Sequence, residues 1–164
     1  MPGPSTAAYR SDNSERGPRI PIAIAVPDTP EELEEYYRFR WQLLRAPWDQ
    51  PIGSERDAFD ATAYHLLARN KAGEIVAVGR IHFPTMNQAQ IRYMATGEKY
   101  RGLGIGSTIL ASLEKVAVDN GATSIFLNAR TTAISFYEQR GYAVHGDGPT
   151  LFRKVQHKVM TKNL

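Results

Sequence analysis

The fold of this chain is decided by the stretch IRYMATGEKYRGLGIG, which covers residues 91–106. Its first part reads as a strand from about Gln90 to Thr96. Beyond a glycine-rich turn, apolar residues recur at helical spacing and predict a helix from about Gly104 to Asn120. This order places the N-terminus of a helix directly behind a tight turn.

The turn itself carries three glycines, at positions 102, 104 and 106. Glycine lets the backbone bend tightly and brings its N–H groups close to a ligand. The helix behind the turn adds a partial positive charge at its N-terminus. Together these features predict an anion site that suits a phosphate or pyrophosphate group. The alternative, that the glycines only pack the helix, stays open at this point.

Phosphate-binding turns differ in the spacing of their glycines. The dinucleotide pattern G-x-G-x-x-G is not met, because the third glycine comes one residue early and position 107 is Ser. The triphosphate loop G-x-x-x-x-G-K-[ST] is not met either, since no Lys follows Gly106. What remains is Arg101-x-x-Gly104-x-Gly106 at a strand-to-helix junction.

Working outward from this junction, hydrophobic patterns and turn residues predict the other elements. The expected strands cover residues 20–26, 64–68, 74–82, 90–96, 124–127, 142–144 and 151–160, and the expected helices cover 30–44, 104–120 and 132–140. This order predicts an α/β (α+β) fold with a mixed, mainly antiparallel sheet of about six to seven strands, flanked by helices. Residues 1–19 are expected to form a flexible N-terminal arm, and residues 20–164 a single domain.

The junction resembles the pyrophosphate loop of the GNAT family of N-acetyltransferases, [RQ]-x-x-G-x-[GA]. Two later segments, LNAR at 127–130 and FYEQRGY at 136–142, resemble the strand and helix that follow this loop in the family. One departure is Thr96-Gly97-Glu98, where the family often has Val-x-Pro. The resemblance covers about residues 20–160 and implies the GNAT fold, with the single domain as an acetyltransferase.

The resemblance also implies acetyl-CoA as cosubstrate and a set of residues that contact it. These are Met94, Ala95, Thr96, Arg101, Gly102, Leu103, Gly104, Ile105, Gly106, Ser107, Asn128 and Tyr137. Tyr137 matches the family tyrosine that protonates the departing thiol of CoA. A phenol with an ordinary pKa near 10 is a proton donor at neutral pH, which suits this role as general acid.

Charge along the chain suggests where a second substrate binds. Residues 27–60 carry 4 basic and 9 acidic side chains, whereas residues 61–164 carry 13 basic and 6 acidic ones. An acidic wall would attract a cationic amine and could take its proton. Glu55, Asp57 and His65 are therefore the candidates for the base or the acceptor site. The alternatives, a solvated acidic face and an ordinary strand histidine, stay open.

Composition excludes several kinds of chemistry. The chain has no Cys, so disulfides, thiolate metal sites and a Cys nucleophile are absent, which favours direct acyl transfer in a ternary complex. The four histidines, His65, His82, His145 and His157, show no ligand spacing, and no metal is expected. No apolar run reaches the roughly 18 residues of a membrane span, and no secretory signal is recognised. A cytoplasmic protein with no membrane partner is expected.

The sequence therefore predicts transfer of an acetyl group from acetyl-CoA to a small-molecule acceptor, expected to be a primary amine. A non-catalytic module that binds or senses acyl-CoA is the alternative. Nucleic-acid binding is not expected, because no motif accompanies the basic residues 153–162. Residues 29–41 and 53–57 resemble the acetyltransferase half of bacterial two-domain proteins with a hotdog thioesterase-like domain, which would link the chain to fatty-acid metabolism. A homodimer is left open.

Overall fold

The computed structural model describes residues 17–164, so most of the expected arm at residues 1–19 lies outside the described residues. The strands are β1 (Ile22–Ala25), β2 (Tyr64–Asn70), β3 (Ile75–His82), β4 (Gln88–Thr96), β5 (Ser124–Arg130), β6 (Ala143–Leu151) and β7 (Val155–Asn163). The α-helices are α2 (Pro30–Leu44), α3 (Ile105–Asp119) and α4 (Ile134–Glu138), and short 3-10 helices cover 46–48, 58–61, 98–100 and 131–133. The predicted fold class is confirmed.

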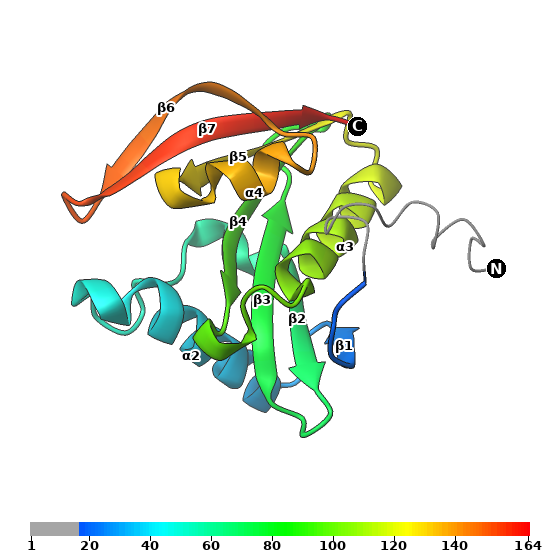
Figure 1. Ribbon diagram of the computed structural model, residues 1–164, viewed down its shortest axis with the longest axis vertical. Coiled ribbons are helices and arrows are strands. Elements are labelled where there is room, and N and C mark those ends of the chain that lie inside the picture. Colours follow the sequence, from blue (N-terminus) through cyan, green and yellow to red (C-terminus); the bar gives the residue numbers. More distant parts are fainter. Residues whose placement is uncertain (1–16) are drawn as a thin grey trace.

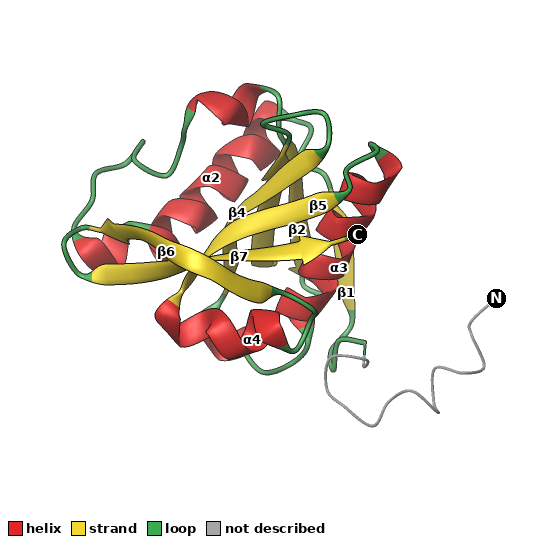
Figure 2. Cartoon of the chain, turned by 90° about the horizontal axis from the view of Figure 1, so that it is seen from above, coloured by secondary structure: helices red, strands yellow, loops and turns green. Residues whose placement is uncertain are grey.

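All seven strands form one open sheet in the order β1-β2-β3-β4-β5-β7-β6 (Figure 1). Every neighbouring pair is antiparallel except β4 and β5, which run parallel. Helix α2 lies on one face of the sheet, and α3 and α4 lie on the other (Figure 2). The single parallel pair sits near the middle of the sheet, where the strand-turn-helix segment begins.

The two faces of the sheet follow from alternation along its buried strands. Leu66 packs in the larger core cluster with Ile109 of α3, whereas its neighbour Leu67 packs in a smaller cluster with Tyr36 of α2. Strand β3 is buried over its whole length because helices cover both of its faces. At Gly79 of β3, an added Cβ would lie 2.8 Å from the Ile109 side chain. This close approach fixes α3 against the centre of the sheet.

Strands β4 and β5 separate after a short stretch of pairing. Their register runs only from Gln88 opposite Ser124 to Ile91 opposite Leu127. On the other side of β4, the register with β3 shifts so that Gly79 faces both Tyr93 and Met94. Such a β-bulge bends a strand, and Tyr93 accordingly has φ 59°. Beyond Ile91, β4 therefore bends away from β5 and has no strand partner on that edge.

Among residues 17–164, no helix is long and apolar enough to cross a membrane.

Candidate active site

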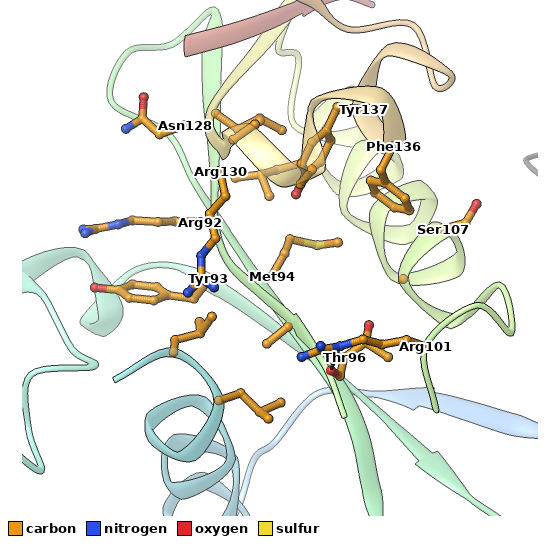
Figure 3. A pocket seen from close by; sticks show the side chains of 18 of the residues that line it. Arg92, Tyr93, Met94, Thr96, Arg101, Ser107, Asn128, Arg130, Phe136 and Tyr137 are labelled. Atoms are coloured by element: carbon orange, nitrogen blue, oxygen red, sulfur yellow. Dashed lines mark hydrogen bonds between the residues drawn. The ribbon is translucent and has the colours of Figure 1, made fainter. Parts of the chain in front are cut away.

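A cavity of about 630 Å³ opens where β4 and β5 separate (Figure 3). Its walls come from the last residues of both strands, the glycine turn with the start of α3, helix α4, the end of α2 and the β6–β7 hairpin. The cavity is thus built by segments far apart in the sequence, and the divergence of the one parallel strand pair makes room for it. Within the described residues, no group of His, Asp or Glu side chains is arranged to hold a metal ion.

The predicted anion-binding turn forms one end of the cavity. Gly102 and Gly104 have φ 76° and 81°, in the left-handed region that favours glycine. Gly104 is the N-cap of α3 and has no side chain to accept from the first-turn N–H groups. Those N–H donors therefore remain for a ligand, at the positive end of the helix and beside the cavity wall formed by Gly106 and Ser107.

Most residues expected to contact CoA line this cavity. They are Met94, Ala95, Thr96, Arg101, Gly102, Gly104, Ile105, Gly106, Ser107, Asn128 and Tyr137. Leu103 does not: its side chain packs against the core, and its carbonyl accepts from the Arg19 N–H at 2.7 Å. The glycine turn and the ends of β4 and β5, which carry residues predicted from separate motifs, therefore lie around one cavity.

Tyr137 reaches the cavity from α4. Its ring packs edge-to-face against Phe136 and Tyr142, and its hydroxyl points into the cavity towards Met94 (Figure 3). Burial raises the pKa of Tyr137 to about 12. The phenol therefore keeps its proton at neutral pH and is present in the cavity wall as a proton donor.

Glu55, Asp57 and His65 do not line the cavity. Asp57 begins the 3-10 helix at 58–61 and accepts ionic hydrogen bonds from Arg80 at 2.6 Å and Arg92 at 2.8 Å. His65 is bonded through Nδ1 to the Tyr36 hydroxyl at 3.0 Å and donates from Nε2 to the Asp60 carbonyl at 2.8 Å. The role of these residues at the acceptor stays a prediction that the geometry does not favour.

Glu55 is equally enclosed. Its side chain is 3 % exposed, and Oε1 accepts from the Gly53 N–H at 2.7 Å. Beside it, the buried Arg40 donates to the Glu55 carbonyl and to the Asp60 carboxylate, each at 3.0 Å. The aspartate carboxylates of the acid-rich loop at 53–60 thus form ion pairs with arginines of α2 and β3, so their negative charge is neutralised within the fold.

The end of the cavity away from the glycine turn is basic. Arg45, Arg92 and Arg130 line it together with Tyr93 and Phe152, and the Arg45 guanidinium lies 5.5 Å from the Tyr93 ring centre. No Asp or Glu of residues 17–164 lines the cavity. An acidic wall was expected from the sequence, but the acids of residues 27–60 lie outside this lining.

His157 of β7 also lines this end and was not singled out by sequence reasoning. Its Nδ1 lies 2.9 Å from the Pro149 carbonyl, which only accepts, so Nδ1 carries the proton and Nε2 a lone pair. Burial, with a smaller effect of the Arg130 charge, lowers the pKa of His157. No local pattern marks this residue, because its place in the site depends on the pairing of β7 with β5.

Comparisons with known proteins identify the class of protein to which this fold and cavity belong. Residues 29–142 match the model of the acetyltransferase (GNAT) family. YjcF of Bacillus subtilis (strain 168), named an uncharacterised N-acetyltransferase, is 26 % identical over 133 residues, which are 81 % of this chain and 94 % of YjcF. This chain belongs to the acetyltransferase (GNAT) family, whose members carry out acyl-CoA-dependent acyl transfer.

Solved structures share the fold at low sequence identity. An acyl-CoA N-acyltransferase from Pseudomonas aeruginosa superposes with a TM-score of 0.74 at 19 % identity, covering 87 % of this chain and 99 % of that one. An aminoglycoside 6'-N-acetyltransferase, solved in complex with coenzyme A, gives a TM-score of 0.68 at 17 % identity, with 86 % and 96 % covered. These likenesses establish the GNAT fold for this chain.

Proposed function

We propose that this protein moves an acetyl group from acetyl-CoA to a primary amine by direct transfer in a ternary complex. The observation that carries the proposal is one cavity with an anion-binding turn at one end and the Tyr137 hydroxyl in its wall. A coenzyme with phosphates at one end and a reactive thioester at the other fits such a cavity. The solved relative in complex with coenzyme A has the same fold and supports this choice of cosubstrate.

Binding would use backbone groups for the most part. The first-turn N–H groups of α3, with Arg101 beside them, would hold the pyrophosphate. The edge of β4 from Met94 to Thr96, which lacks a strand partner, would hydrogen-bond the pantetheine arm much as another strand does. Asn128 lies at the facing end of β5 and would contact the same arm.

The chemical step joins two proton transfers. The amine nitrogen attacks the thioester carbonyl carbon, forming a C–N bond, and the C–S bond then breaks. Tyr137 gives its proton to the leaving thiolate, while His157 takes the surplus proton from the amine through Nε2. Because the chain has no Cys, no acetyl-cysteine intermediate is available, and the acetyl group passes directly to the amine.

The test is release of free CoA from acetyl-CoA over a panel of amino acids, polyamines, aminoglycosides, peptides and acyl-carrier thioesters. The last group covers the link to fatty-acid metabolism that the narrower resemblance to two-domain proteins suggests. Thiol release that matches formation of an acetylated amine supports the proposal. Binding of acetyl-CoA without thiol release on any amine would identify a non-catalytic acyl-CoA sensor instead. The cytoplasmic location stays a prediction, and a homodimer stays open.

A further inference from the structure

The basic end of the cavity, away from the glycine turn, is where an acceptor would meet the thioester, and we call it the acceptor end. Two of its three arginines, Arg45 and Arg130, have no carboxylate partner among the described residues. Arg92 is neutralised by Asp57 at 2.8 Å, but Arg45 donates only to the uncharged carbonyls of Ser54 and Leu44. Burial first, and then the charges of Arg92 and Arg130 among others, lower the pKa of Arg45. The charge of Arg45 therefore has no anion of the protein's own to balance it within the described residues.

Arg130 has even fewer partners than Arg45. Its side chain is half-buried and extends from β5 into the gap between the two strands, towards Tyr93 (Figure 3). It makes no hydrogen bond or ion pair with any described residue, and its nearest aromatic partner is the Trp48 ring, 6.0 Å away. Desolvating a guanidinium without an anionic partner is unfavourable, so such a group in a cavity wall is suited to a ligand.

We propose that Arg130 binds a carboxylate of the acceptor, so that the acceptor is an amine of the amino-acid kind and not a polycation. This inference rests on the proposed acyl transfer and narrows its acceptor. The planar guanidinium can hold both carboxylate oxygens at once. Arg45 adds attraction from the end of α2, and the absence of Asp and Glu from the cavity lining of residues 17–164 removes any repulsion of an anion.

Neighbouring His157 completes the arrangement. Arg130 and His157 are directly opposite one another in the β5–β7 pairing, so their side chains are neighbours on the sheet. An acceptor whose carboxylate is held by Arg130 would have its amine within a short reach of the Nε2 lone pair. A single anchor would thus both select the acceptor and place its nitrogen beside the base.

The experiment measures binding of N-acetyl-amino acids, which resemble the expected product, and of their uncharged amides. Calorimetric titrations are run on the wild-type protein with and without saturating CoA, over a panel that spans the natural side chains. We expect at least one carboxylate to bind about 10- to 100-fold more tightly than its amide. That preference should vanish in Arg130→Met, be partly kept in Arg130→Lys, and be unchanged in Arg38→Met, which alters an exposed arginine of α2.

Any of four outcomes would overturn the inference. One is that no carboxylate is preferred over its amide, and another is that Arg130→Met keeps the preference. The third is that Arg130→Met weakens CoA alone, which would assign Arg130 to the coenzyme. Titration with succinyl-CoA tests whether the carboxylate that Arg130 binds belongs to the acyl donor and not to the acceptor. If the protein binds succinyl-CoA more tightly than acetyl-CoA, and this difference is lost in Arg130→Met, the inference is also rejected. Absence of CoA binding would reject the proposed function, whereas the titrations without CoA still decide the carboxylate question.

Discussion

Arg130 and His157 face each other across the β5–β7 pairing, one a cation without an anionic partner among the described residues and the other a histidine kept neutral. Burial and the neighbouring guanidinium both lower the pKa of His157, and the Pro149 carbonyl fixes the proton on Nδ1. The Arg130 guanidinium can therefore hold an anionic acceptor, and the Nε2 lone pair of His157 beside it can take a proton from the acceptor amine.

The pH dependence of kcat should report this pair. A base must be neutral to act, so kcat is expected to rise with pH through the pKa of His157, below the ordinary value of 6.5. Removing the cation in Arg130→Met raises that pKa and moves the acid limb to higher pH. The measurement is kcat against pH at saturating substrates. An acid limb that stays in place in Arg130→Met, or persists in His157→Gln, would contradict the assignment of His157.

Tyr137→Phe should lower kcat by about 10²-fold or more, the usual contribution of a general acid, and leave the Kd for acetyl-CoA almost unchanged. The expected cause is loss of the proton donor with the ring packing kept. Tyr142→Phe is the matched control, because its hydroxyl donates to Glu114 at 2.9 Å and lies outside the cavity lining. Equal kcat in the Tyr137→Phe and wild-type enzymes would remove Tyr137 from the mechanism.

Asp57→Asn should destabilise the fold by about 2 kcal/mol, because the buried Arg80 loses a charged hydrogen bond to Asp57 but keeps its ion pair with Asp60 at 2.9 Å. The Arg80 side chain is fully buried and donates to Asp57 at 2.6 Å. Asp147→Asn is the control. The Asp147 side chain is 86 % exposed, so its ion pair with Lys158 should contribute little to the free energy of unfolding. The free energy of unfolding is measured in urea, and kcat per folded molecule should be kept. A stable but inactive Asp57→Asn would restore the acceptor role expected from the sequence.

The Asp57 carboxylate should also make the free energy of unfolding fall as the pH falls. Burial alone would raise the pKa of Asp57, but the hydrogen bond and charge of Arg80 outweigh it and bring the pKa from 3.8 to about 2. A depressed carboxyl pKa stabilises the fold above the unfolded value, and this contribution is lost as pH falls from about 4 through 2. Acid unfolding curves of the wild type and Asp57→Asn should therefore converge over that range, and a constant gap between them would contradict the ion pair.

Local patterns were enough for the fold and for the glycine turn that forms one end of the cavity. The turn between β4 and α3 is contiguous in sequence, so the glycines and Arg101 could be placed without knowing the sheet. Tyr137 came from the match of a short helix to the family, and the structure brings its hydroxyl to the cavity that Gly104 also lines. Such features need no knowledge of long-range register.

The acceptor end could not be predicted in the same way. His157 meets Arg130 only through the pairing of β7 with β5, which no local pattern specifies. The acids near Asp57 looked free in the sequence because their partners Arg40 and Arg80 lie on α2 and β3, far along the chain. Charge counts alone cannot tell a carboxylate that attracts a substrate from one that neutralises a buried arginine.

The central claim is that the cavity binds an acyl-CoA at the glycine turn, and a calorimetric titration of acetyl-CoA into the wild type and Gly104→Ala tests it most directly. Gly104 has φ 81° beside the cavity, whereas Gly121, with φ 83°, ends α3 away from it and gives a control with the same backbone strain in Gly121→Ala. We predict one micromolar site per wild-type chain, unchanged in Gly121→Ala and weakened at least about tenfold in Gly104→Ala. Absence of saturable binding to the wild type, or equal affinity in all three proteins, would contradict the account.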